Sequence, residues 1–146
     1  MTTDLPEDFL ARLATDSPDA IVYADETGRI RFWNAAATRI FGFAESEAIG
    51  QSLDLMIPER LRGRHWEGWN RVMGGGASRY GEGALLAVPA QHKDGRQISI
   101  EFTILPLSDE SGTPRGIAAF LRDATARFEE IRALRRELAE LKAKGG

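Results

Sequence analysis

The residues most capable of chemistry lie in the stretch 60–73, which reads RLRGRHWEGWNRVM. His65, one of only two histidines in the chain, stands here between arginines and two tryptophans. A neutral imidazole is an ordinary axial ligand of a noncovalent heme iron. A histidine is also a common polar residue on the surface of an arginine-rich helix. The choice between these interpretations separates a gas or redox sensor from a protein without a metal.

The absence of cysteine narrows the remaining chemistry. It excludes disulfides, thiolate metal sites, cysteine nucleophiles and covalent heme attachment through a CxxCH motif. It also excludes photochemistry that needs a cysteine adduct with a chromophore. The glycines at 74–76 and 81–83 are not followed by the Gly-Lys-Ser/Thr of a phosphate loop. With two histidines and no supporting catalytic motif, the sequence favours a protein that is not an enzyme.

The overall composition indicates one globular domain. The chain has 146 residues, of which 42% are hydrophobic and 28% charged, as is typical of folded domains. Its apolar runs are too short to span a bilayer, and the N-terminus lacks the pattern of a signal peptide. We therefore expect a cytoplasmic protein without membrane contact. The net charge of -3 argues against general nucleic-acid binding.

The first half of the chain predicts short helices around a β-hairpin. The stretch 5–15 predicts a helix with Leu5, Phe9, Leu10 and Leu13 on one face. Strands at 21–24 and 30–33 flank a turn in which Gly28 supplies a positive φ. Asn34 is expected to cap a short helix that ends at Gly42. A further short helix capped by Ser46 and a longer one from Pro58 to the glycines at 74–76 follow, with packing contacts expected from Ile49, Leu53 and Ile57.

The second half predicts strands. Segments 78–91 and 97–107 flank a turn at Asp94-Gly95, and 117–123 forms the last strand. The alternation of Ile98, Ile100, Phe102 and Ile104 with polar residues is the two-residue period of a sheet with one wet face. The predicted fold class is therefore α+β, with about five antiparallel strands and short helices on one face.

The C-terminal segment 124–146 predicts a coiled-coil helix. With a positions at 124, 131 and 138 and d positions at 127, 134 and 141, the last two heptads are apolar, whereas the first d position is Arg127. In a parallel dimer Glu130 would face Arg135 of the second chain, and Glu137 would face Lys142. An ordinary amphipathic helix with intrahelical charge pairs is the alternative. We expect a homodimer held by the N- and C-terminal helices.

Several stretches, taken together and in order, resemble those of a PAS domain. The resemblance covers about residues 16–126 and implies a PAS fold, with an N-terminal helix at 1–15, the sensor domain at 16–123 and a signalling helix at 124–146. The stretches are DAIVYADETGRIRFWNAAATRIFGF, IGQSLDLMIPE, HKDGRQISIEFTILPL and RDATAR.

The resemblance also implies a cofactor. The pattern MIPERLRGRHWEGW is similar to that of heme-binding PAS sensors of the rhizobial oxygen-sensor kinase type, and it implies His65 as the ligand of a heme b iron. Arg71 and Arg79 are the implied partners of the heme propionates. The positions that approach a bound gas fall near Ala84 and Leu86, which offer no hydrogen bond, so oxygen affinity should be weak relative to CO or NO. Further contacts are expected from Ile57, Ile100 and Phe102, and Leu85 is expected with Leu86 on the sheet face that the helices cover.

Two other functions fit the same residues. One is a cofactor-free PAS module for dimerisation and protein interaction, and the other is a sensor of a small organic ligand. In each case a downstream signalling protein, or an output domain outside this chain, is expected to read the signal.

Overall fold

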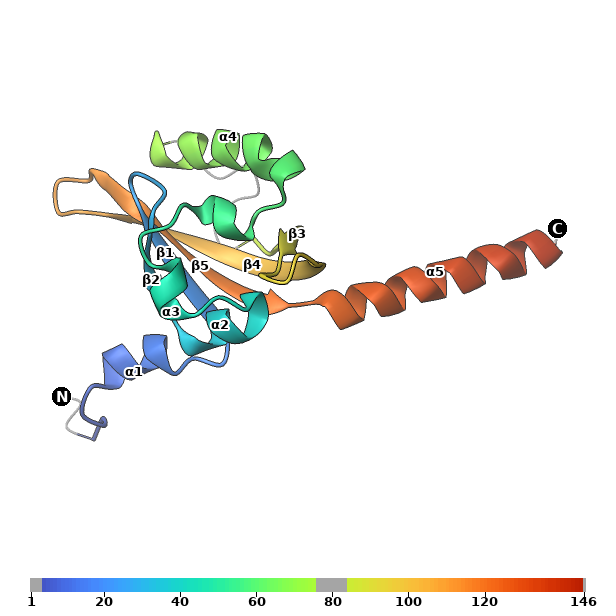
Figure 1. Cartoon of the computed structure of the whole chain (residues 1–146), viewed down its shortest axis with the longest axis horizontal. Coiled ribbons are helices and arrows are strands. Elements are labelled where there is room, and N and C mark those ends of the chain that lie inside the picture. Colours follow the sequence, from blue (N-terminus) through green and yellow to red (C-terminus); the bar gives the residue numbers. More distant parts are fainter. Residues whose placement is uncertain (1–3, 76–83, 146) are drawn as a thin grey trace.

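The computed structural model describes residues 4–75 and 84–145. Its centre is a five-stranded sheet in the order β2-β1-β5-β4-β3, and every neighbouring pair is antiparallel (Figure 1). The expected α+β fold is thereby confirmed. The strands are β1 (Ala20–Asp25), β2 (Ile30–Trp33), β3 (Leu86–Gln91), β4 (Gln97–Ser108) and β5 (Pro114–Asp123).

The helices divide into those that cover the sheet and those that leave it. Figure 1 shows α2, α3 and α4 on one face of the sheet, whereas α1 and α5 project from the domain in different directions. The helical elements are α1 (Phe9–Thr15), α2 (Ala35–Phe41), α3 (Glu45–Ala48), η1 (Leu53–Met56), η2 (Glu59–Leu61), α4 (Arg62–Met73) and α5 (Thr125–Gly145). None of the described helices is long and apolar enough to cross a membrane.

The core fills the space between the sheet and the covering helices. Strand residues at alternate positions supply the inner face, including Val22, Ile98 and Leu121, each at most 2% exposed. Trp33 and Phe41 add the largest buried side chains, and their ring centroids lie 5.7 Å apart. We call this covered side of the sheet the inner face and the opposite side the outer face.

Three expectations about the helices are wrong. The N-terminal helix begins at Phe9 rather than near residue 5, because Asp8 adopts a left-handed backbone with φ of 60°. Ser46 lies inside α3, whose N-cap is Ala44; the Glu47 carboxylate accepts the Ala44 N–H at 2.9 Å instead. Ile49 is 37% exposed rather than packed.

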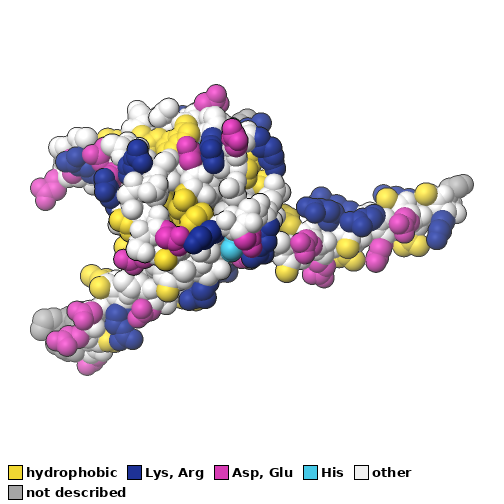
Figure 2. Space-filling model, in the orientation of Figure 1, with side chains coloured by type: hydrophobic (Ala, Val, Ile, Leu, Met, Phe, Trp, Pro, Cys, Tyr) yellow, Lys and Arg dark blue, Asp and Glu magenta, His cyan; other side chains and the backbone are white. Residues whose placement is uncertain are grey.

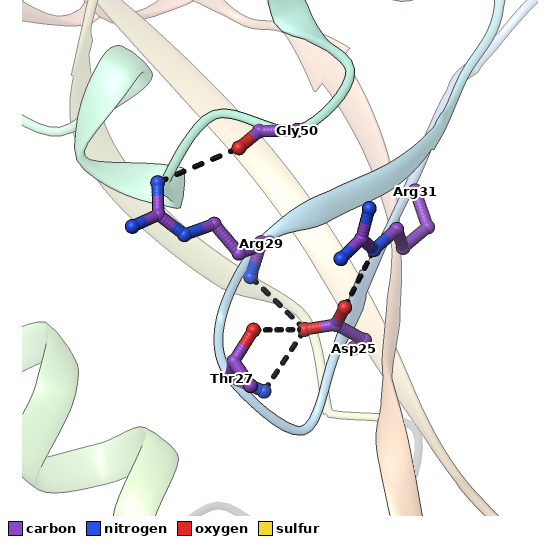
Figure 3. A network of polar contacts seen from close by, with 5 residues as sticks. All are labelled: Asp25, Thr27, Arg29, Arg31 and Gly50. Atoms are coloured by element: carbon purple, nitrogen blue, oxygen red, sulfur yellow. Dashed lines mark hydrogen bonds and ion pairs between the residues drawn. The ribbon is translucent and has the colours of Figure 1, made fainter.

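The turn between β1 and β2 is held by one carboxylate (Figure 3). Asp25 Oδ1 accepts the backbone N–H groups of Thr27 at 2.9 Å and Arg29 at 3.2 Å, and Asp25 Oδ2 accepts Arg31 Nε at 2.6 Å. Arg29 also donates to the carbonyl of Gly50 at 3.4 Å. Gly28 has the predicted positive φ, at 78°. The hairpin is therefore fixed by its own turn before any helix packs on it.

The turn between β4 and β5 repeats this arrangement. The sequence DESGTPR matches DETGRIR in spacing. Asp109 accepts the N–H groups of Ser111 at 2.9 Å and Thr113 at 3.0 Å, and it pairs with Arg115 at 3.2 Å. Because Asp25 lies opposite Gly116 across β1 and β5, both turns stand at the same end of the sheet.

The ionised form of Asp25 is the one that the fold favours. Partial burial raises the pKa of Asp25, but hydrogen bonds from Thr27, Arg31 and Arg29 outweigh this effect and hold that pKa well below its ordinary value of 3.8. A depressed carboxyl pKa contributes stability above the unfolded-state pKa, and that contribution is lost as the pH falls below it.

We predict that Asp25→Asn destabilises the domain by about 1–2 kcal/mol at pH 7, since the amide cannot supply the charge that Arg31 binds. The difference in unfolding free energy between the wild type and the variant should become smaller as the pH falls below 3.8. Urea unfolding at pH 7 and pH 3 measures it. Glu26→Gln removes a charge from the same turn and is the matched control. A difference from wild type that is equal at both pH values would contradict the prediction.

Candidate functional site

Helix α4 presents one face to the core. His65, Trp69 and Val72 follow one another at the spacing i, i+4, i+7, which places them on one side of a helix. Trp69 is 8% exposed and belongs to the core, and Val72 packs against it. His65 is half-buried on the same side. The sequence therefore aims the imidazole inward rather than toward solvent.

The neighbouring residue, Trp66, anchors this helix to the hairpin. Its indole N–H donates to Asp54 Oδ1 at 2.8 Å. Its ring lies so close to Gly28 that a Cβ at that position would stand 2.5 Å from Cη2 of the indole. Arg62 adds bonds from its guanidinium to the carbonyls of Ile57 at 3.0 Å and Asp54 at 3.3 Å. These contacts fix where the start of α4 lies and hence where His65 points.

The His65 imidazole lies among aromatic rings. Its centroid is 4.6 Å from that of Trp66, edge to face, and 6.4 Å from that of Trp69. Its Nδ1 atom is buried and has no hydrogen-bond partner among the described residues. Burial lowers the pKa of His65 from its ordinary value of 6.5, while the charge of Asp54 opposes the shift. The ring is therefore neutral at pH 7, in the form that can donate a lone pair.

The other candidate residues lie on and beside β3 and β4. Leu86 stands opposite Phe102 in the β3–β4 ladder, and both are half-buried. Ile100 is 5% exposed on the same, inner, face. Ile57 and Ala84 are half-buried at the ends of neighbouring elements. The inner sheet face is therefore apolar at the positions named from sequence. Leu85, which we expected on that face too, is 64% exposed.

The structure describes one of the two arginines that are candidate partners of the propionates. Arg71 lies on α4 and is exposed. Arg79 lies outside the described residues, so its expected role remains a prediction.

The chain's own residues fit a heme in two respects. The buried Nδ1 finds no hydrogen-bond partner among the described residues, and the sheet residues Ile100, Phe102 and Leu86 offer, on the inner face, the apolar surface that a porphyrin needs. A groove of about 290 Å³ lies elsewhere, on the outer side between β3 and α5, where Pro89 and Phe128 are among its walls.

Sequence reasoning located the junction between the sheet and α5 at the closing stretch RDATAR, but it missed the contacts that form the junction. The Ala124 N–H donates to the carbonyl of Ser99 at 2.8 Å, and the Ser99 N–H donates to Thr125 Oγ1 at 3.0 Å. Arg127 forms an ion pair with Glu101, which is only 9% exposed. A charged residue at a d position was the available signal, because it marks a heptad that does not pack as a coiled coil.

The second histidine is also better packed than its surroundings suggested. His92, beside the β3–β4 turn, has a side chain only 15% exposed. It lies against Gly42, where an added Cβ would stand 2.5 Å from the imidazole Cε1. Lys93 then pairs with Glu47 at 2.6 Å. These contacts dock the β3–β4 turn onto the helices and belong to the fold.

Comparison with known proteins gives a consistent result. Residues 14–129 match the family described as PAS fold. The chain is 30% identical over 145 residues to the sensor protein FixL of Bradyrhizobium diazoefficiens, an alignment that covers 95% of this chain and 28% of that protein. It is 32% identical over 116 residues to the oxygen sensor protein DosP of Escherichia coli, covering 77% and 14% respectively. The chain thus spans less than a third of these relatives.

Solved structures share the fold at lower identity. The PAS domain of a protein from Colwellia psychrerythraea superposes with a TM-score of 0.70 at 24% identity, covering 80% of this chain and 95% of that one. An RNA-binding light-oxygen-voltage receptor gives a TM-score of 0.73 at 22% identity, covering 95% and 39%. At these identities the likeness concerns the fold alone.

The contact between Trp66 and Gly28 can be tested by adding one methyl group. Gly28→Ala should cost about 1–2 kcal/mol for the positive φ and about 1–3 kcal/mol more for displacing the indole. Gly95→Ala is the matched control, since φ is also positive there, at 93°, but nothing lies within 4 Å of the added Cβ. Urea unfolding compares the two. Equal losses would show that Trp66 does not restrict position 28.

The buried imidazole should make stability depend on pH. As the pH falls below 6.5, the unfolded chain binds a proton at His65 before the folded one does, so the free energy of unfolding decreases. His65→Leu should remove this decrease and stabilise the cofactor-free protein at pH 5 by about 1 kcal/mol, because an unpaired polar group is replaced by an apolar one. If the unfolding free energies of the wild type and of His65→Leu change in parallel between pH 7 and pH 5, the prediction is wrong.

Proposed function

We propose that this chain, which belongs to the PAS fold family of sensory modules, binds heme b through His65 and responds to a diatomic gas or to redox state. The observation that carries the proposal is the imidazole of His65, aimed inward from α4, whose buried Nδ1 has no hydrogen-bond partner in the part of the chain that the structure describes. The names of the relatives, a sensor protein and an oxygen sensor protein, support a sensory role.

Each candidate residue has a role in this proposal. His65 would supply the axial nitrogen, and its lowered pKa keeps it in the neutral form. Arg71 and Arg79 would pair with the propionates. The apolar side chains of Ile57, Leu86, Ile100 and Phe102 would exclude water from the porphyrin faces. The bound iron would supply reversible gas binding or a change of oxidation state.

The gas preference follows from the two side chains expected beside a bound gas. Ala84 and Leu86 carry no hydrogen-bond donor for a bound gas. A ligand that gains from a donor, such as O2, therefore receives no such help here, whereas CO needs none. We infer a site that favours CO or NO over O2.

The signal would leave through β4 and α5. Ile100 and Phe102 point to the inner face, whereas Ser99 and Glu101, the residues between and beside them, hold the start of α5. A shift of the inner side chains would displace the outer ones on the same strand and change the angle of α5. A homodimer held together by α1 and α5 would transmit that change to a downstream signalling protein or to an output domain.

A second candidate function is a cofactor-free interaction module of the same family. The aromatic packing favours it, because the rings of Trp66 and Trp69 lie 5.5 Å apart, edge to face, beside His65 and already occupy space there. In that case the same helices would act as a scaffold. A third candidate function is a sensor that binds a small organic ligand at the apolar face.

Absorption spectroscopy tests the heme proposal directly. The protein, reconstituted with hemin and desalted, should show a Soret band at a ratio near one heme per chain. His65→Ala should lose the band or shift it, because the axial nitrogen is gone. His92→Ala removes the other histidine of the chain and should keep the spectrum of the wild type.

The outcomes separate the candidate functions. Reduction followed by CO titration should shift the Soret band of the wild type, and O2 should bind more weakly than CO. A spectrum that is the same for wild type and His65→Ala would remove His65 as the ligand. The lack of any band after reconstitution would favour the cofactor-free module.

A further inference from the structure

The groove between β3 and α5 lies outside the proposed cofactor site. It has a volume of about 290 Å³, and its walls include Ala87 and Pro89 from the strand and Phe128 and Ile131 from the helix. Ala87 is exposed, and the two helical side chains are only half-buried. The groove therefore offers apolar surface that the described part of the chain leaves partly uncovered.

Helix α5 presents one of its sides to the groove. The residues that line the groove from this helix follow the spacing i, i+3, i+4, i+7, namely Phe128, Ile131, Arg132 and Arg135. Glu130 and Glu137 stand about half a turn away from Phe128, on the opposite side of the helix. Figure 2 shows Lys and Arg side chains along the upper side of the first half of α5 in that view. The groove is therefore bordered by positive charge.

The two arginines of the groove have no carboxylate partner in the part of the chain that the structure describes. Neither Arg132 nor Arg135 forms an ion pair there, and the described residues that line the groove include no Asp or Glu. Arg127, on the same helix, is by contrast paired with Glu101. A guanidinium matches a carboxylate in shape and charge. The groove thus combines an apolar floor with two uncompensated positive charges.

The free edge of β3 limits how a partner can bind. This strand is the last of the sheet, and Pro89 lies opposite Ser99 of β4. Ser99 donates its N–H to Thr125 Oγ1 and accepts the N–H of Ala124, so its backbone groups point away from β3. In an antiparallel pair the backbone of Pro89 then points toward the free edge. Because proline has no N–H to offer there, addition of a further strand is disfavoured.

We propose that this groove binds an acidic segment of a partner protein. The segment binds as a helix or a turn, with carboxylates that pair with Arg132 and Arg135 and an apolar side chain that contacts Phe128. The inference rests on the downstream partner in the proposed function and deepens it by naming the surface and its chemistry. A nucleic acid suits the groove less well, because a phosphate backbone leaves the apolar floor uncovered.

The groove stays accessible when two copies pair through α5. The apolar residues of the expected coiled coil, Leu134, Leu138 and Leu141, lie across the helix from Arg132. Arg132 occupies a b position of the heptad, outside the a, d, e and g positions that meet the other helix. Arg135 occupies an e position and would face Glu130 of the second chain. Arg132 therefore reports on the groove separately from the dimer.

The groove shares a wall with the junction that holds α5. Ser99 lines the groove and also bonds to the first residues of the helix. A change in the angle of α5 would move the helical wall relative to the strand wall. A partner that prefers one angle would shift the domain toward it, so partner binding and the state of the sensor would be linked.

Fluorescence anisotropy with a defined peptide tests the groove. The probe is a fluorescein-labelled peptide of about three helical turns, with Glu on one face and Leu and Phe on the other. Its counterpart carries Gln in place of every Glu. The acidic peptide should bind the full chain without any cofactor, and the neutral peptide should bind at least tenfold more weakly.

A negative charge placed in either wall should weaken binding of the acidic peptide at least fivefold. Arg132→Glu changes the helical wall, and Ala87→Glu changes the strand wall. Arg136→Glu and Ala126→Glu are the matched controls, since they make the same changes at exposed residues of α5 outside the groove. Their dissociation constants should stay within twofold of wild type. Circular dichroism melts confirm that each variant is folded.

Three results would overturn the proposal. They are the absence of peptide binding at about 300 µM of the chain, equal binding of the acidic and neutral peptides, and a loss at Arg136→Glu as large as that at Arg132→Glu. Tighter binding of a short DNA duplex than of the peptide would also overturn it and assign the arginines to nucleic acid. Binding that appears only after Phe9→Ser would show that α1 of a second copy fills the groove, which again overturns it.

The readouts separate this proposal from the function on which it rests. Peptide binding is measured on the chain without cofactor, so a missing Soret band leaves the result for the groove intact. Sedimentation equilibrium of Arg132→Glu should give the dimer dissociation constant of the wild type. A chain that shows the Soret band but binds the peptide equally well with and without Arg132→Glu would lose the groove and keep the heme.

Discussion

The two-residue period of β4 is the constraint on which the rest of the structure depends. A strand sends successive side chains to opposite faces, so Ile98, Ile100 and Phe102 must enter the inner face when Ser99 and Glu101 hold α5. A one-residue slip of register would exchange these two sets completely. The candidate cofactor surface and the contacts that hold the start of α5 are therefore two properties of one strand.

The aim of His65 depends on a second contact, which is local. Trp66 is fixed by its ring on Gly28 and by its indole bond to Asp54. The next inward residue, Trp69, is part of the core. The imidazole therefore sits between two anchored aromatic residues on a helix that cannot rotate freely. A change at His65 would be passed to the hairpin turn through Trp66 as well as to the sheet.

The sequence predicted those features that depend on short-range stereochemistry. Gly28 and Gly42 adopt positive φ, and Asn34 accepts the N–H of Ala37 as an N-cap, because each is determined by residues within one turn. The inward alternation of β4 was equally local. The α+β architecture and the family followed from the order of these signals, and the family match and the sheet topology confirm both.

The errors arose where distant contacts decide. The exposure of Ile49 and Leu85 depends on how the rest of the chain packs around them, whereas the late start of α1 follows from the left-handed backbone of a single residue, Asp8. The partner of Arg127 could not be named from sequence either, because Glu101 lies on β4 and Arg127 on α5, and the β4–β5 pairing brings the two elements together.

The order of the strands also bears on how the chain folds. The two strands next to each other in the middle of the sheet, β1 and β5, come from opposite ends of the domain, and Ala20 lies opposite Leu121. A contact between residues so far apart in sequence carries a large loop-closure cost and slows folding. The hairpins β1–β2 and β3–β4 can form early from their own turns, but the sheet cannot close until β5 has left the ribosome. Until then the inner faces of both hairpins are exposed, which is the state of a chain that is most prone to aggregate.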